Sequence, residues 1–376
     1  LDHPSPINPS DEHTLDLTSE ELHSITRASK EDELVAKITP YLSRLLESKK
    51  TLVNSEHYKW PVIGYKPDLF YCFPNCYEEM GEPAEGREHR LPNCKYHFGI
   101  PHAKLLDSVV ILEAKKKIRS EGMKKMVHYL QVLPDNSIGR GILFDCQGCH
   151  LIEMKGQQNH KVVTYHAYGK WDTPGLSNSI IKFAEVTSKM DSVLSQSLTH
   201  HQLTLDSFLG AGGFGRVYRV VDRNGEIRAL KVSSSPNLNN EFAWMEKLMK
   251  EAEGRVVPVI ENSFVQFSEG ACYLLAQVGE PVKRIRSEVM SACRALDNLH
   301  ASGYCHGDAR FQNIIKVNSQ LLWIDLMFCV PKSAAAQLKD FKYLISSFLR
   351  ISKVCLYALC IILLDFLTSF QFFYLG

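Results

Sequence analysis

Residues 303–315 read GYCHGDARFQNII and form the most informative segment of the chain. A helical pattern precedes the segment and an apolar strand pattern follows it, so His306, Asp308 and Asn313 are expected in a loop between a helix and a strand. A carboxylate in such a loop can accept a proton from a hydroxyl, and an amide oxygen nearby can bind Mg²⁺. The segment therefore indicates a chemical site, and a plain polar turn is the alternative.

This loop resembles the catalytic loop of protein kinases. The resemblance implies that Asp308 orients the proton of the attacking hydroxyl, that Asn313 holds a magnesium ion, and that Arg310 contacts the γ-phosphate of ATP. Gly307 stands where those kinases carry an arginine, so we do not expect an activation loop clamped by phosphothreonine. Small-molecule kinases of the aminoglycoside type share the HGDxxxxN form, which leaves the phosphate acceptor open.

Residues 209–218 read LGAGGFGRVY and fit the kinase pattern GxGxxGxV. In that family small residues let backbone amides approach the phosphates of ATP, and Val217 would cover the base. A glycine-rich hairpin with a structural purpose has the same pattern. The nucleotide-binding positions that the resemblance implies are Gly210, Ala211, Gly212, Gly213, Phe214, Gly215, Val217, Ala229, Lys231 and Gln277.

A strand is expected at residues 228–232, after a hairpin that turns at residues 224–225. The strand places Lys231 where kinases have the lysine that binds the α- and β-phosphates. A helix is expected next, and Glu241 on this helix is the expected ion-pair partner of Lys231, with Glu246 as the alternative.

The apolar residues 321–324 end at Asp325, which matches the metal-binding aspartate of the kinase DFG motif. Met327 replaces the glycine of that motif, so we do not expect the usual switching of this loop. The motifs occur in kinase order and predict a phosphotransferase that uses ATP and Mg²⁺ on serine or threonine hydroxyls of a protein. The C-terminal lobe is expected to be shortened, with a helix near Asp340 anchoring the catalytic loop.

The first half of the chain carries Asp68 and, at the end of an apolar strand, Glu113-Ala-Lys115. Alternation along the strand puts Glu113 and Lys115 on one face. The arrangement resembles PD-(D/E)xK nucleases, which implies that Asp68 and Glu113 share a Mg²⁺ ion. Lys115 would then position the attacking water, and Gln131 on the following helix would assist. A solvated, charged strand end is the alternative.

A basic cluster next to this motif could meet the phosphate backbone of DNA. Its members are Lys115, Lys116, Lys117, Arg119, Lys124 and Lys125. Over the whole chain 43 basic residues face 42 acidic ones, so the net charge of +1 gives no overall field that favours nucleic acid or membrane. Any such partner has to be recognised by a local cluster.

Cys72, Cys76, Cys94 and His97 form a CxxxC and CxxH arrangement that could bind Zn²⁺, with free core cysteines as the alternative. The 11 cysteines are irregularly spaced, which favours a reducing, intracellular compartment. The apolar run 354–375 is long enough to span a bilayer but contains Asp365. A buried helix and a mispredicted gene end are the alternatives to a membrane span.

The predicted organisation is α/β plus α+β, with a restriction-endonuclease-like α/β domain before a bilobal protein-kinase-like domain. The expected boundaries are 1–19 for a tail, 20–175 for the nuclease-like domain, 176–200 for a linker helix, 201–352 for the kinase-like domain and 353–376 for the apolar end. The chain begins at Leu1, so we expect a fragment, and sequence upstream of it could carry targeting information.

A nuclease-like domain joined to a compact kinase with HGDxxxxN and WIDL resembles the Crinkler effectors of oomycetes and fungi, over about residues 40–345. The resemblance implies secretion and action in a host cell, commonly in its nucleus. Three further functions remain open: an impaired pseudokinase that binds host partners, a Mg²⁺-dependent nuclease regulated by the kinase half, and a small-molecule kinase.

Overall fold

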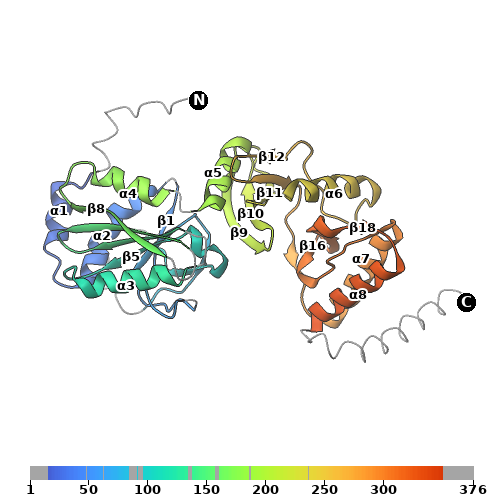
Figure 1. Cartoon of the computed structure of the whole chain (residues 1–376), viewed down its shortest axis with the longest axis horizontal. Coiled ribbons are helices and arrows are strands. Elements are labelled where there is room, and N and C mark those ends of the chain that lie inside the picture. The colour runs from blue at the N-terminus through green and yellow to red at the C-terminus, as the bar shows by residue number, and fades with distance from the viewer. Residues whose placement is uncertain are drawn as a thin grey trace, which may run out of the picture. The chain divides into compact units, whose positions relative to one another are not determined.

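The structure is a computed structural model that describes residues 16–349 apart from 48, 62, 84–90, 92–95, 134–137, 157–160, 186–187 and 236. The chain forms two compact units (Figure 1), the first of residues 1–195 with 206–210 and the second of 196–205 with 211–376. The described chain is mixed α and β with several sheets, which agrees with the predicted class at this level.

A six-stranded sheet in the order β1-β2-β5-β6-β7-β8 forms the centre of the first unit. Its strands are β1 (Thr51–Asn54), β2 (Leu69–Cys72), β5 (Val110–Ala114), β6 (Gly139–Phe144), β7 (Gly148–Lys155) and β8 (Val162–Lys170). β5 and β6 are parallel, and the other neighbours are antiparallel. The apolar strand expected before Lys115 is present as β5.

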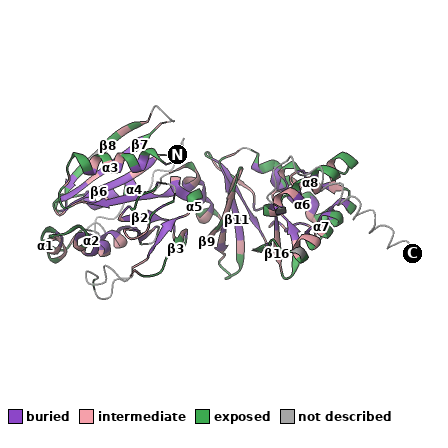
Figure 2. Cartoon of the chain, turned by 90° about the horizontal axis from the view of Figure 1, so that it is seen from below, coloured by how far each residue is buried: buried purple, intermediate pink, exposed green. Residues whose placement is uncertain are grey.

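Helices cover both faces of this sheet (Figures 1 and 2). They are α1 (Ser19–Thr26), α2 (Glu31–Leu46), α3 (Ser120–Gln131) and α4 (Leu176–Glu185). Leu112 of β5 packs in one core with α1, α2 and α4, whereas its neighbour Ile111 packs with α3 on the opposite face. Because side chains alternate along a strand, Glu113 points to the α3 side. The α3 face therefore carries the first candidate site.

The predicted linker helix at 176–200 differs from the structure. Two helices occupy this segment, α4 and α5 (Lys189–His201). Leu176, Ile180 and Phe183 of α4 are buried in the core of the first unit, so α4 belongs to that unit. The apolar residues of α4 recur at helical spacing because they pack on the sheet of the first unit.

The second unit begins with a five-stranded sheet in the order β12-β13-β11-β10-β9. Its strands are β9 (Thr204–Gly212), β10 (Gly215–Val221), β11 (Ile227–Ser233), β12 (Val265–Gln266) and β13 (Ala271–Leu275). The hairpin between β10 and β11 turns where predicted, since Val221 pairs with Ile227 and Gly225 has a φ of +79°. That φ favours glycine over any residue with a Cβ.

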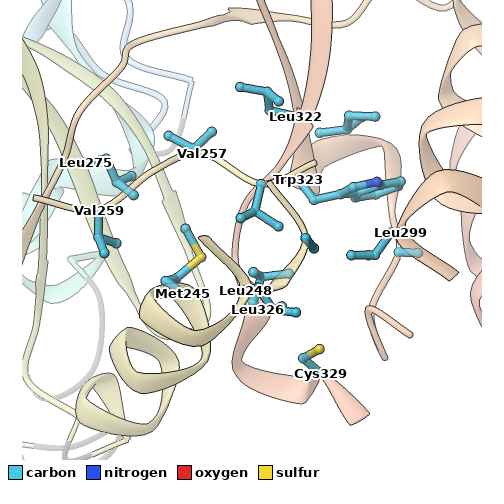
Figure 3. Close-up of a cluster of buried hydrophobic side chains, with 14 of the residues drawn as sticks. Met245, Leu248, Val257, Val259, Leu275, Leu299, Leu322, Trp323, Leu326 and Cys329 are labelled. Carbon is cyan, nitrogen blue, oxygen red and sulfur yellow. The ribbon is translucent and has the colours of Figure 1, made fainter. Parts of the chain in front are cut away.

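The rest of the second unit is mostly helical. Its elements are α6 (Leu238–Glu251), β14 (Glu280–Pro281), α7 (Arg286–Ala301), β15 (Tyr304–Cys305), β16 (Ile314–Val317), β17 (Gln320–Trp323), β18 (Val330–Pro331) and α8 (Ala334–Leu349). One apolar core joins α6, α7 and β17. Figure 3 shows Met245 and Leu248 of α6 in the same cluster as Trp323 and Leu326. This core fixes the backbone on which the second candidate site is built.

Among the described residues, no helix has the length and hydropathy needed to cross a membrane. The apolar run 354–375 lies outside the described residues. The prediction of a membrane span there stays a prediction.

Candidate functional sites

Lys231 is the centre of the site in the second unit. Its strand β11 lies between β10 and β13, with Val217 and Tyr273 as the paired residues. The Lys231 Nζ lies 2.6 Å from Glu241 Oε1 and 2.9 Å from Asp325 Oδ1. The Tyr273 hydroxyl donates a 2.7 Å hydrogen bond to the same Glu241 oxygen. One ammonium group therefore joins α6 to the loop after β17.

The charges of Lys231 and Glu241 interact strongly because both side chains are buried. Lys231 is 7% exposed and Glu241 is 0% exposed. Burial opposes the charged form of Lys231, but the carboxylates of Glu241 and Asp325 outweigh this effect and raise the pKa of Lys231. The alternative partner, Glu246, makes no contact with Lys231 among the described interactions, and Glu241 Oε2 is buried without a hydrogen-bond partner among them.

Asp325 has an unusual backbone conformation. Its φ of 65° and ψ of 54° lie in the left-handed region, which costs a non-glycine residue free energy and is typical of functional positions. A Cβ built on Gly212 would lie 3.9 Å from Asp325 Oδ2, so the glycine-rich loop lies beside this carboxylate. A Cβ at Gly215 would lie 2.4 Å from the Val232 carbonyl oxygen, which explains glycine at that position.

Other predicted nucleotide-binding positions differ in their surroundings. A Cβ at Gly210 or Gly213 would meet open space, so packing does not require glycine there. The ring of Phe214 at the loop tip lies 5.6 Å from that of Phe328. Ala229 is buried on β11, and Gln277 follows β13 with a buried Oε1 that has no hydrogen-bond partner among the described residues.

Asp308 and Asn313 contact each other in the loop after β15. Asn313 Nδ2 donates to Asp308 Oδ2 over 3.1 Å and to the Asp308 carbonyl over 2.9 Å. Arg310 lies 2.5 Å from the same carboxylate oxygen and is 53% exposed. The predicted base and the predicted metal ligand thus lie together, and the arginine is free to turn toward solvent.

His306 connects this loop to the strand that carries Asp325. Its Nδ1 accepts from the Asp308 backbone amide, so its Nε2 is protonated and donates to the carbonyl of Ile324 over 3.0 Å. Burial lowers the pKa of His306, which favours this neutral form. The Ile324 amide donates to the Asn313 carbonyl over 3.0 Å. The two parts of the site are therefore joined by hydrogen bonds.

Asp340 of α8 holds the backbone of the loop at residues 306–307, and the sequence predicted a helix near Asp340 that anchors this loop. Its fully buried carboxylate accepts hydrogen bonds from the amides of His306 and Gly307 over 2.7 and 2.9 Å. Gly307 has a φ of +80°, and a Cβ there would lie 1.9 Å from the Phe328 carbonyl oxygen. Glycine at the position of the kinase arginine is therefore a steric requirement, which the sequence did not reveal.

The candidate site of the first unit lies at the ends of β2 and β5. Glu113 is fully buried, and its Oε1 lies 2.7 Å from Lys115 Nζ and in contact with Lys125 Nζ. Asp68 Oδ2 accepts a 2.6 Å hydrogen bond from the Ala114 amide. Asp68, Glu113 and Lys115 are thus brought together as the motif predicts.

Burial and the negative charge of Glu113 together raise the pKa of Asp68 well above its usual range. For Lys115 burial acts in the opposite sense, but the charges of Glu113 and Asp68 outweigh it and raise the pKa of the amine. Glu113 Oε2 is buried without a hydrogen-bond partner among the described residues. A buried carboxylate with a free oxygen beside a second carboxylate suits a hard cation such as Mg²⁺.

The structure does not bring Gln131 to this pair. Gln131 is exposed at the end of α3, and no described interaction joins its side chain to Asp68 or Glu113. Lys125 and Tyr129 of α3 face the pair instead, one helical turn apart. Helical spacing from Lys125 could have indicated Tyr129, because residues four apart share a face.

The predicted zinc ligands are described only in part. Cys72 and Cys76 are buried, and His97 Nδ1 lies 2.9 Å from the Tyr77 hydroxyl. Cys94 lies outside the described residues, so zinc binding there stays a prediction.

A different group, His300, Cys305 and Asp340, has ligand atoms within 4.8 Å of one another. The Asp340 oxygens already accept from two backbone amides, and His300 Nε2 lies 3.1 Å from Oδ2. Anchoring of the loop at residues 306–307 accounts for this group.

A scan against protein-family models gives no match to this chain, and a search of curated proteins gives none either. The functional conclusions below therefore depend on the residues and their geometry.

Proposed function

We propose that the second unit transfers the γ-phosphoryl group of ATP, with Mg²⁺, to a serine or threonine hydroxyl of a protein. The observation that carries this proposal is the sharing of Lys231 between Glu241 and Asp325, in hydrogen-bonded continuity with Asp308 and Asn313. Buried lysines with two carboxylate partners are costly to maintain, and a phosphate-binding role gives a reason for one.

Each side chain has a defined task in this proposal. Lys231 would bind the phosphates and keep its charge, while Glu241 fixes its orientation. Asp325 and Asn313 supply the carboxylate and amide oxygens that would hold Mg²⁺, which neutralises phosphate charge when bound. Asp308 would accept the hydroxyl proton after Arg310 leaves its carboxylate.

The test is transfer of labelled phosphate from ATP by the whole chain, to itself and to generic protein acceptors. We expect Lys231→Met and Asp308→Ala to abolish labelling. Lys250→Met on α6 and Asp297→Ala on α7 are matched controls, because both residues are exposed and lie outside the site. If the two site variants label as strongly as the controls, the proposal fails.

Two alternatives give different results in the same assay. A small-molecule kinase would leave proteins unlabelled but would label a metabolite, again dependent on Asp308. A pseudokinase would transfer nothing, and its protein partners would bind equally well to Asp308→Ala. The HGDxxxxN loop is compatible with both alternatives. The assay should therefore offer protein acceptors and small-molecule acceptors.

A second candidate function is Mg²⁺-dependent hydrolysis of nucleic acid by the first unit. It is supported by the proximity of Asp68, Glu113 and Lys115 and by the unpartnered Glu113 oxygen. Two carboxylates can hold the metal that activates water, and a lysine can contact the scissile phosphate. Cutting of DNA in Mg²⁺ that survives Glu47→Ala, an exposed control, but not Glu113→Ala would support this function. Equal cutting by the two variants would refute it.

Membership of the Crinkler effectors is likewise proposed, because a nuclease-like arrangement precedes a kinase-like one in a single chain. Secretion and action in a host nucleus are what that membership would imply. Finding the tagged chain in the nucleus of host cells would support it, and exclusion from the nucleus would count against it.

A further inference from the structure

An exposed aromatic side chain lies beside the acidic pair, Asp68 and Glu113. We propose that Tyr65, with His128 packed edge-to-face against it, forms a platform on which a base stacks, and that this surface binds single-stranded nucleic acid. The inference deepens the second candidate function and rests on it. It adds a substrate class and a residue, Tyr65, that the nuclease-like motif does not contain.

A chain of ring contacts leads from the acidic pair to Tyr65. Lys125 Nζ contacts Glu113 and lies 5.5 Å from the centre of the Tyr129 ring. The Tyr65 ring lies 5.9 Å from that of Tyr129 and 5.0 Å from that of His128. Tyr65 is thus separated from the acidic pair by one buried ring. A nucleotide next to the scissile phosphate would reach it.

Tyr65 is held in place although it is 47% exposed. The Trp60 amide donates to the Tyr65 carbonyl over 2.9 Å, and the Gly64 amide donates to the Trp60 carbonyl over 2.9 Å. Trp60 itself is buried edge-on against Phe70 of β2, at 5.2 Å between ring centres. Gly64 has a φ of +72°, which permits the turn. An aromatic face on an anchored loop loses little entropy when a base stacks on it.

Exposed cations occur on the chain segments that carry Tyr65, follow β5 and form α3. Lys66, Lys117, Arg119 and Lys124 are exposed, and no ion pair is found for them within the described part of the chain. Glu31 is the acidic residue that already bonds here, to Lys115 Nζ over 3.2 Å and to the Lys116 amide over 3.1 Å. Exposed cations attract a phosphate backbone, and an exposed planar ring of the same unit offers a contact to bases.

The ring favours an unpaired strand over a duplex. A base must leave its neighbour or its pairing partner before it stacks on a side chain. This step costs a few kcal/mol in a duplex, whereas a single strand has no base pair to break. Lysines alone would bind both forms, because phosphates occur in both. Preference for the single strand should therefore depend on Tyr65.

The test is fluorescence anisotropy of the whole chain with a labelled oligonucleotide of mixed sequence, offered as single-stranded DNA, single-stranded RNA and duplex DNA, with Ca²⁺ in place of Mg²⁺. We expect either single strand to bind more tightly than the duplex, and the two single strands identify the natural sugar. Tyr65→Ala should weaken single-strand binding by about tenfold and leave duplex binding nearly unchanged. Tyr65→Phe should retain binding. Tyr168→Ala, an exposed tyrosine of β8, is the matched control.

Lys117→Ala should weaken single strand and duplex alike and reduce the salt dependence. Equal affinity for both forms, or no effect of Tyr65→Ala in a variant that melts like wild type, would overturn the inference. Cutting that depends on Glu113 without single-strand preference would leave the hydrolase standing and remove the platform. Single-strand binding that depends on Tyr65, without any cutting in Mg²⁺, would support the platform and exclude the hydrolase.

Discussion

Lys231 in the second unit and Lys115 in the first each contact a fully buried glutamate, but the charges around the two pairs differ. Lys231 is shared between two carboxylates, those of Glu241 and Asp325. Around Glu113 the numbers are reversed, because Lys115 and Lys125 both contact one carboxylate oxygen. The first arrangement has an excess of negative charge and the second an excess of positive charge at the glutamate.

The two sites therefore differ in the charge that each would bind. In the proposed function, the excess negative charge at Asp325 would be balanced by the Mg²⁺ that enters with the nucleotide. In the first unit two lysines already balance the charge of Glu113 through Oε1, whereas Oε2 has no hydrogen-bond partner among the described residues. The pKa of Asp68 beside it is raised by burial and by the charge of Glu113. The metal must therefore compete with a proton there. The predictions below separate the two sites on this basis.

The largest effects are expected on activity. Asp308→Ala should lower phosphate transfer by about 10²–10⁴-fold, the usual contribution of a general base, and leave any DNA cutting unchanged. Glu113→Ala should do the opposite. The measurement is both assays on both variants, with Asp297→Ala as control. A variant that impairs both activities equally would show that the two sites are not independent.

The next effect is on stability. Glu241→Ala leaves Lys231 buried with one partner fewer, and removal of one member of a buried ion pair typically costs about 3–5 kcal/mol. Glu113→Ala leaves Lys115 and Lys125, which are 19% and 38% exposed and can be hydrated, so a loss of about 1 kcal/mol or less is expected. Hydrogen exchange measured by mass spectrometry reports each unit separately. Equal losses of stability in the two units would contradict the proposed difference between Glu241 and Glu113.

The two sites should also differ in their response to pH. The folded pKa of Asp68 is raised, so above the unfolded value of about 4 the folded unit holds a proton that the unfolded chain has released. Stability of the first unit therefore falls as pH rises from about 4 through the folded pKa. Asp68→Asn should remove that slope in urea unfolding. A wild-type slope that persists in Asp68→Asn would assign it to another group.

Lys231 provides the contrast. Its pKa is raised, so its contribution to stability is complete below the unfolded value of about 10.4 and is lost only as pH rises through the folded pKa. Lys231→Met should therefore change the free energy of unfolding by the same amount at pH 5 and at pH 9. A strong pH dependence of that difference within this range would mean that Lys231 is not charged throughout.

The smallest effects are expected for Arg310 and Lys125, the more exposed ion-pair partners in the two sites. Arg310 is 53% exposed, and exposed ion pairs contribute about 0–1 kcal/mol. Arg310→Ala and Lys125→Ala should each shift the free energy of unfolding by less than about 1 kcal/mol, as measured by urea unfolding. A loss near 3 kcal/mol for either would show a buried role that its exposure does not indicate.

The sequence predicted those parts that depend on neighbours along the chain. The hairpin at residues 224–225, the strand with Lys231 and the loop with Asp308 and Asn313 each follow from local periodicity or spacing. The start of α1 shows the same kind of local contact, since the Thr18 hydroxyl and Glu21 form a reciprocal cap. Local rules suffice where the contacts are local.

The remaining parts depend on packing between distant segments. The hydrogen bond from Tyr273 to Glu241 joins β13 to α6, and no spacing rule links the two. The resemblance to PD-(D/E)xK nucleases indicates Gln131, but a helix turns by about 100° per residue, so when Lys125 faces Glu113 the side chain of Gln131 points elsewhere. Glycine at position 307 follows from the close approach of Phe328, which only the folded chain shows.

The most direct test of the proposed metal–nucleotide site is calorimetric titration of the whole chain with ATP in the presence and absence of Mg²⁺. The predicted result is binding that requires Mg²⁺ in wild type and in Lys250→Met, with loss of the Mg²⁺ requirement or of binding itself in Asp325→Asn. Absence of ATP binding in wild type, or identical titrations of wild type and Asp325→Asn, would contradict the account.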